Sequence, residues 1–212
     1  MEESNSDVYD AIRTAILRGD YAPRQRLGAA ELAETFGTSR FVVRSALLQL
    51  VGERLVEFQP NRGARVRELT LDEALEIIDL REIIEGLIAA RAAERITDDQ
   101  ITELRGLAEA METAIKDLNI TEYARLNDGL HQRLREIAEH ETADRMLEQL
   151  NARVVRNQFH MAVDSNSPHV GLPQHLAIID AVCSRDAARS ERLMRDHIGD
   201  VRDQLAAQAK TG

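Results

Sequence analysis

The sequence has little cysteine, few aromatic residues and no long apolar run. Cys183 is the single cysteine among 212 residues, so the chain can form neither an internal disulfide nor a cysteine metal cluster. No apolar stretch approaches the roughly 20 residues of a membrane span, and the acidic start MEESNSD is unlike a signal peptide. We therefore expect a cytoplasmic protein that does not bind membranes.

Aromatic residues make up only 3% of the chain, and tryptophan is absent. Ala, Leu, Ile, Arg and Glu dominate instead, a composition that favours helices over sheets. The 43% of apolar and 30% of charged residues exclude wholesale disorder. The length suits one large domain or two small ones.

The net charge of −10 is unevenly distributed along the chain. Residues 11–69 hold ten basic and six acidic residues, a net charge of +4, whereas residues 70–212 hold 17 basic and 27 acidic residues. A basic front joined to an acidic back indicates two domains with different partners. We place these domains at residues 1–69 and 70–212.

The apolar spacing in the first domain predicts three helices and then a β hairpin. The predicted helices cover residues 7–18, 29–37 and 40–54. Ser39 is a good N-cap for the third helix, and the short turn before it contains Gly37, which gives a helix-turn-helix pattern. The strands LVEFQ and ARVRE flank the turn PNRG, so the hairpin is a basic wing.

A winged helix-turn-helix places the N-terminal residues of its second motif helix in the major groove of DNA. Arg40 and Arg44 lie four residues apart on one helix face, and arginine recognises guanine through two hydrogen bonds. The Ser39 hydroxyl and the helix N-terminus can hold a phosphate, and Arg62 suits the minor groove. Any three-helix bundle can mimic this pattern. The predicted DNA-binding residues are Ser39, Arg40, Phe41, Arg44, Arg62 and Gly63.

The second domain reads as six helices in an antiparallel bundle. They cover about residues 70–95, 97–118, 119–139, 141–163, 173–184 and 186–207. SNSPHVGLP, residues 165–173, is the only long loop. The fold class is therefore mostly α, with an N-terminal winged helix-turn-helix, a small β-hairpin wing and a C-terminal six-helix bundle.

Histidines in the second domain are candidate metal ligands. Asn127 and His131 share a helix face at i and i+4, while His175 and His197 lie on two later helices. Neutral imidazoles are common ligands of divalent metals, and three nitrogens with one oxygen would leave coordination positions open. On spacing alone, however, scattered histidines are more often surface or core residues. The remaining histidines have an equal claim by composition: His140, His160 and His169.

Several motifs resemble a known family. The spaced elements of residues 16–66, including SRFVVRSALLQL and the wing NRGARV, resemble the N-terminal domain of the GntR superfamily of bacterial transcription regulators. The sequence departs from the family at Arg24, at Ala29-Ala30-Glu31 and at Phe41-Val42, where the family has Thr-Pro, so the operator cannot be inferred. LREIIEGLIAARAAE, LNDGLHQRL, PQHLAIIDAV and MRDHI resemble the FCD ligand-binding domain of the FadR subfamily, and the six helices resemble its VanR-like group.

The resemblance implies one divalent metal ion, Zn²⁺ in the first place and Ni²⁺ or Mn²⁺ as alternatives. Carried over to this sequence, its ligands are Asn127, His131, His175 and His197. Many relatives have Asp where Asn127 stands, so the metal here would keep more positive charge for an anionic ligand. The resemblance further implies a small carboxylate effector, and Arg81 and Arg153 are candidates to bind its far end. An Arg–Glu pair such as Arg81–Glu85 is, however, commonly structural.

We therefore interpret the chain as a metabolite-responsive transcription regulator, a homodimer on double-stranded operator DNA, and not as an enzyme. The family usually works as a repressor that a small organic acid releases. One alternative is a constitutive DNA-binding regulator with a purely structural metal. The other is a metal-dependent hydrolase, for which no carboxylate is evidently placed as a general base, although Asp128 and Glu136 lie near the predicted ligands in sequence.

Overall fold

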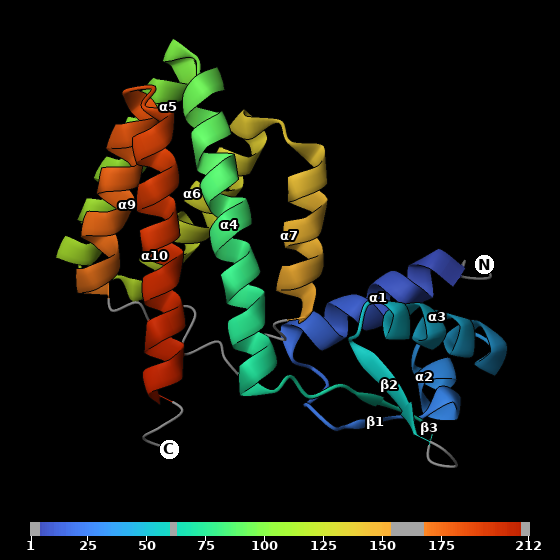
Figure 1. The fold of residues 1–212 in the computed structure, drawn as a ribbon. Helices are drawn as coiled ribbons and strands as arrows, with labels where there is room; N and C mark the ends of the chain where they lie inside the picture. Colours follow the sequence, from blue (N-terminus) through green and yellow to red (C-terminus); the bar gives the residue numbers. More distant parts are fainter. Residues whose placement is uncertain (1–4, 60–62, 154–167, 209–212) are drawn as a thin grey trace. The chain divides into compact units, whose positions relative to one another are not determined.

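The computed structural model describes residues 5–59, 63–153 and 168–208. The chain forms two compact units (Figure 1). The first unit comprises Met1–Thr70 with Glu148–His160, and the second comprises Leu71–Leu147 with Met161–Gly212. The predicted fold class is confirmed: helices dominate, and a small antiparallel sheet follows the helix-turn-helix.

The first unit contains the predicted three helices and the hairpin, together with one further strand. Its elements are α1 (Asn5–Arg18), β1 (Arg26–Leu27), α2 (Ala29–Thr35), α3 (Arg40–Gly52), β2 (Val56–Gln59) and β3 (Gly63–Val66). The predicted apolar face of α1 is buried through Val8, Ile12 and Ile16. The predicted face of α3 is buried as well, and both faces belong to one core.

Local sequence signals fix the turn between α2 and α3. Gly37 has φ +61°, a left-handed conformation that glycine adopts without steric cost. Ser39 is the N-cap of α3, because its Oγ accepts a hydrogen bond from the backbone N–H of Val42 at 3.3 Å. Together they confirm the helix-turn-helix prediction and fix where α3 begins.

The sheet has the order β1-β3-β2, so the wing hairpin carries an extra edge strand. β1 pairs with β3 at Arg26 and Arg65, and it was not predicted because two residues show no alternation. In the predicted hairpin, Val56 faces Val66 and both are buried. Phe58 lies two residues further along β2, on the same side as Val56, but it is 41% exposed near the turn of the hairpin, where it pairs with Ala64.

The second unit is built from helices that the bundle prediction located well. They are α4 (Leu71–Arg95), α5 (Asp98–Lys116), α6 (Ile120–Ala138), α7 (Glu141–Arg153), α9 (Pro168–Cys183) and α10 (Ala187–Gln208), and α7 extends past the boundary between the units. α4 packs on α6, α9 and α10, and α5 packs on α6 and α9. None of these helices, nor any other in the described ranges, could cross a bilayer.

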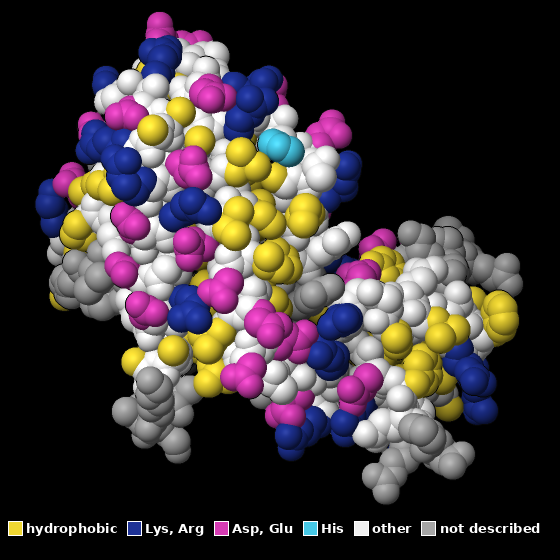
Figure 2. All heavy atoms as spheres, viewed as in Figure 1, with side chains coloured by type: hydrophobic (Ala, Val, Ile, Leu, Met, Phe, Trp, Pro, Cys, Tyr) yellow, Lys and Arg dark blue, Asp and Glu magenta, His cyan; other side chains and the backbone are white. Residues whose placement is uncertain are grey.

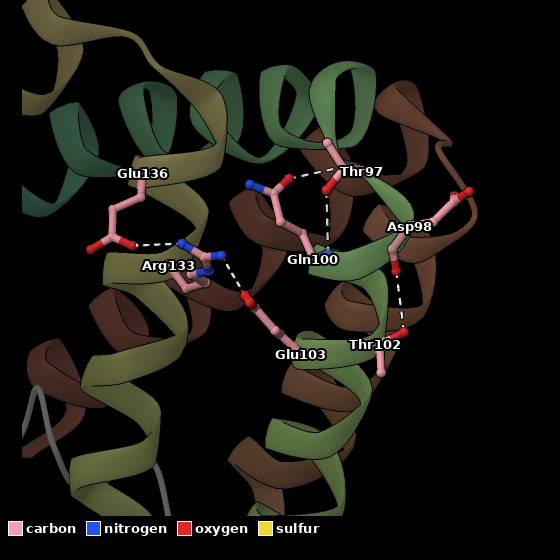
Figure 3. Close-up of polar contacts among 7 residues, drawn as sticks. All are labelled: Thr97, Asp98, Gln100, Thr102, Glu103, Arg133 and Glu136. Atoms are coloured by element: carbon pink, nitrogen blue, oxygen red, sulfur yellow. Dashed lines mark hydrogen bonds and ion pairs between the residues drawn. The ribbon is translucent and has the colours of Figure 1, made fainter.

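Capping residues define where α5 and α6 begin, and each helix starts one residue after the start of its predicted range, 97–118 or 119–139. Thr97 and Gln100 form a reciprocal capping box at the start of α5 (Figure 3). At the start of α6, the Asn119 side chain accepts a hydrogen bond from the backbone of Glu122. Arg133 of α6 pairs with Glu103 of α5 and with Glu136 of its own helix, so it links the two helices (Figure 3).

The predicted long loop is partly wrong. α9 begins at Pro168, so residues 168–173 are helical rather than loop. A proline at the first position of a helix loses no hydrogen bond, because that N–H has no partner inside the helix. Pro173 lies further in and costs one bond, but the rest of α9 is held by its buried residues Ile178, Ala181 and Val182. The predicted helix end at residues 154–163 lies outside the described residues.

Close approach between α4 and α10 brings the C-terminal helix against the middle of α4. A Cβ atom on Gly86 would lie 2.7 Å from Cγ of Arg195, so the arginine stem occupies the space that a side chain would need. His197 follows two residues later and is 4% exposed. The glycine therefore lets α10 place a histidine deep between the helices.

Candidate functional site

Three of the four predicted metal ligands converge inside the second unit. His131 comes from α6, His175 from α9 and His197 from α10. One nitrogen of each ring lies within 4.8 Å of the corresponding nitrogen of the other two. The Nε2 atoms of His175 and His197 are 3.3 Å apart, and these two side chains are almost fully buried.

Each histidine is held through its Nδ1 atom by a different polar side chain. His131 contacts Oε2 of Glu85 at 2.8 Å, and His175 contacts the Tyr123 hydroxyl at 2.9 Å. His197 contacts Oε1 of Gln174 at 2.9 Å. Such contacts fix ring orientation and tautomer, and they are typical of histidines that bind metal through the other nitrogen.

The hydrogen bonds also determine which nitrogens carry a proton. Gln174 donates from its Nε2 to Asp200 at 2.5 Å, so its oxygen faces His197 and accepts from Nδ1–H. The Glu85 carboxylate can only accept, so it takes the Nδ1–H of His131. In the neutral rings, Nε2 of His131 and His197 therefore presents a lone pair. The Tyr123 hydroxyl can either donate to Nδ1 of His175 or accept from it. The proton of that neutral ring can therefore lie on either nitrogen, and Nε2 is a donor in the first case and a lone pair in the second.

Burial keeps the two inner imidazoles neutral. It lowers the pKa of His175 to about 2 and the pKa of His197 to about 3. His131 adds to both shifts, and His197 adds to that of His175. Burial also raises the pKa of the Tyr123 hydroxyl to about 12. For Glu85, burial favours protonation, but the Arg81 guanidinium and His131 outweigh it and hold the pKa of that carboxyl well below its usual range.

The residues present fit a divalent transition metal. Oδ1 of Asn127, the predicted fourth ligand, lies one helical turn before His131, and it is buried without a hydrogen-bond partner among the described residues. A buried carbonyl oxygen without a partner costs stability, and a cation would supply one. The 3.3 Å between Nε2 of His175 and His197 is close to the roughly 3.3 Å between two nitrogens bound tetrahedrally to Zn²⁺ at about 2.0–2.1 Å.

Of the two arginines predicted to bind the effector, the structure describes the side chain of Arg81 only. Arg81 lies on α4 and forms an ion pair of 2.8 Å with Glu85, as its i,i+4 spacing predicts, and its side chain is 14% exposed. Through Glu85 it adjoins the ring of His131. Arg153 is the last residue of α7, and its side chain lies outside the described residues.

The other histidines do not join this cluster where the structure describes them. His140 accepts a hydrogen bond at Nδ1 from the backbone N–H of Ala143 at 3.3 Å, so it caps the start of α7. His160 and the side chain of His169 lie outside the described residues. Glu136, one of the two carboxylates considered for the hydrolase, is an exposed partner of Arg133.

Sequence reasoning missed the three side chains that hold the histidines. Glu85 lies 46 residues before His131, and Tyr123 lies 52 residues before His175. One signal was available: Tyr123, Asn127 and His131 recur every four residues, so they share one face of α6. Gln174 is adjacent to His175 in sequence, but it comes to His197 only because α9 and α10 pack together.

The predicted DNA-binding residues of α3 lie at the surface of the first unit. Ser39, Arg40, Phe41 and Arg44 are all exposed, and Phe41 is 82% exposed. Within the described part of the chain, neither Arg40 nor Arg44 has an ion-pair partner, so both guanidinium groups are available to a ligand. Gly63 begins β3 with φ +80° and is exposed, whereas Arg62 lies outside the described residues.

Comparison with known families matches both parts of the chain. Residues 5–66 match the family described as bacterial regulatory proteins, gntR family, and residues 76–200 match the FCD domain. The HTH-type transcriptional repressor RspR of Escherichia coli (strain K12) is 29% identical over 201 residues, which cover 95% of this chain and 88% of the repressor.

Two further similarities extend over nearly the whole chain. An HTH-type transcriptional regulator in an unstable DNA locus of Streptomyces ambofaciens is 30% identical over 94% of this chain and 84% of its own length. The solved structure of E. coli McbR/YncC is similar with a TM-score of 0.74 at 21% identity, covering 99% of this chain and 100% of that one. These relatives are regulators and not enzymes. The chain belongs to the GntR family of bacterial transcription regulators, with a DNA-binding helix-turn-helix followed by an FCD domain.

Proposed function

We propose that this regulator senses a small organic acid through a divalent metal ion in its second domain, residues 70–212, and controls operator binding by its first, residues 1–69. Asn127, His131, His175 and His197 would hold the metal. The observation that carries the proposal is the convergence of three imidazoles, each with a side chain bonded to Nδ1. Zn²⁺ is the first choice, with Ni²⁺ or Mn²⁺ as alternatives.

The charges around the site favour an anionic effector. All four proposed ligands are neutral, and the nearby carboxylate of Glu85 is paired with Arg81. A bound divalent cation would therefore keep its charge uncompensated, and its chemistry there is to accept a carboxylate oxygen at an open position. Arg81, whose partner Glu85 contacts His131, would bind a second oxygen group of the effector, and we retain Arg153 as a second candidate.

A homodimer gives a role to an exposed apolar face of α4. Leu80, Ile83 and Leu87 are 50%, 54% and 41% exposed and recur at helical spacing. Figure 2 shows hydrophobic side chains along the visible side of this helix. This apolar stripe is the candidate dimer contact. A second copy of the chain would cover it, and two first domains would then read a near-palindromic operator.

α4 connects the proposed sensor to the proposed dimer contact. Arg81 and Glu85 lie on its inner side and contact the histidine cluster through His131. Ile83 and Leu87 lie on its exposed side. An effector that binds the two dimer arrangements with unequal affinity would shift the population between them, and so change operator affinity. We propose repression, released by the effector.

The test compares operator binding by the metal-loaded and the chelator-treated full chain during a screen of small carboxylates. We expect some carboxylate to release the metal-loaded wild type from DNA, and the same acid to have no effect on chelated protein or on folded His197→Ala. Constitutive binding that no carboxylate alters, together with loss of folding in His197→Ala, would favour the alternative of a structural metal.

A further inference from the structure

The exposed face of α3 carries an apolar line beside its two arginines. Phe41 and Leu48 are 82% and 62% exposed. They are seven residues apart, two helical turns, so they lie almost directly above one another. Arg44 lies between the turns that carry Phe41 and Leu48, and Arg40 lies at the edge of the same face. The opposite face, with Val43, Ala46, Leu47 and Leu50, is buried.

The position of Phe41 makes its exposure informative. Single exposed apolar residues are normal on protein surfaces and need no explanation. Phe41, however, is the second residue of α3, two positions after its N-cap Ser39. It therefore belongs to the first turn, which in a helix-turn-helix approaches the base edges in the major groove. Its phenyl ring is not used by the core of the first unit.

We infer that Phe41 recognises the C5-methyl group of a thymine that neighbours the base contacted by Arg40 or Arg44. The methyl group is the only apolar feature that the major groove presents, and phenylalanine is among the side chains that contact it. The arginines suit guanine at O6 and N7. The operator half-site then contains a thymine beside a guanine. This inference rests on the DNA binding of the first domain and not on the metal or the effector.

The experiment uses the full chain and a DNA duplex selected by it from a random pool. Each thymine of the selected half-site is replaced in turn by deoxyuridine, which removes only the methyl group. We expect one position to weaken wild-type binding about fourfold, the effect of one buried methyl at about 0.8 kcal/mol and about 1.4 kcal/mol per tenfold. Phe41→Ala should bind both duplexes equally, because the contact is already lost.

Leu48→Ala is the matched control, an exposed apolar residue of the same helix beyond its first turns. It should keep the wild-type response to deoxyuridine. Equal sensitivity of wild type and Phe41→Ala at every thymine would overturn the inference. If the wild type selects a duplex but deoxyuridine weakens its binding at no position, only the proposed contact between Phe41 and a thymine methyl group is contradicted. If it selects no duplex at all, the DNA-binding role of the first domain fails with it.

Discussion

The two units carry their functional side chains in opposite ways. In the first unit, Arg40, Phe41 and Arg44 come from one helix and are exposed. In the second, His175 and His197 are 2% and 4% exposed and come from different helices. A surface for a large, rigid ligand such as DNA needs one well-placed helix. A site for a small ligand needs several elements, because its side chains must converge and be desolvated together.

This difference predicts how each site responds to substitution. Exposed residues of α3 that follow its cap Ser39 can change without loss of packing, so their effects should appear in DNA binding alone. The buried histidines take part in both packing and ligand binding, so their effects should appear in stability as well. Four experiments test this contrast, starting with the one from which we expect the largest effect.

The largest effect is expected for His175→Ala. Metal that binds only the folded state stabilises it by about 2.7 kcal/mol at a free concentration of about 100 times Kd. Thermal unfolding with and without added Zn²⁺ should show this stabilisation in wild type and none in His175→Ala. Equal stabilisation of both proteins would show that the metal binds elsewhere. His140→Asn is the control, because asparagine can replace the cap that His140 provides.

Glu85→Gln should have a smaller effect on the same site. The amide retains the shape of the carboxylate but removes the charge that orients His131 and pairs with Arg81. Loss of such an outer partner typically weakens metal binding about 10- to 100-fold. Competition with a chromophoric chelator measures the affinity. An unchanged affinity would mean that His131 is not held through Glu85 when it binds metal.

Arg44→Ala tests the exposed surface. It should weaken binding to the selected operator by about 1–3 kcal/mol if Arg44 contacts a base, with the stability of the fold unchanged within about 0.5 kcal/mol. Anisotropy titrations with labelled duplex and urea unfolding provide the two values. Arg145→Ala, an exposed arginine of α7, should leave operator binding unchanged. Equal losses of operator affinity in both variants would mean that Arg44 acts only through its positive charge and not through a base contact.

Removing the caps should have the smallest effect and should separate the units. Ser39→Ala and Thr97→Ala each remove an N-cap hydrogen bond, at α3 and at α5, and each should cost about 1 kcal/mol of stability. Only Ser39→Ala should also weaken operator binding, because of these two helices only α3 carries residues that are predicted to contact DNA. Unfolding and binding of both variants under one buffer condition make the comparison. A binding defect in Thr97→Ala would contradict the separation.

The sequence predicted the features of the fold that depend on neighbouring residues. The Ser39 cap, the buried face of α3 and the start of α5 all depend on residues that are close together in the sequence. β1 was missed because its two residues carry no period and are defined by pairing with β3. The start of α9 was missed because Pro168 and Pro173 resemble loop signals, while the packing that holds this helix is tertiary.

The candidate site was predictable in part. Spacing placed Asn127 beside His131 and made His175 and His197 candidates on two later helices. The family resemblance then favoured these four residues over the remaining histidines. The side chains that hold the rings could not be found locally, because Glu85 and Tyr123 reach their histidines from about 50 residues away along the chain. The shared exposed face of Arg40 and Arg44 could be predicted from the spacing of one helix alone.

The most direct test of the account is the metal content of the purified protein, measured by elemental mass spectrometry on wild type, His131→Ala and His140→Asn after Zn²⁺ or Ni²⁺ is supplied. One metal site formed by these four ligands would hold about one ion per chain. We expect that content in wild type and His140→Asn and none in His131→Ala. A wild-type protein without metal, or a His131→Ala variant that retains it, would contradict the proposal that these histidines form the sensor.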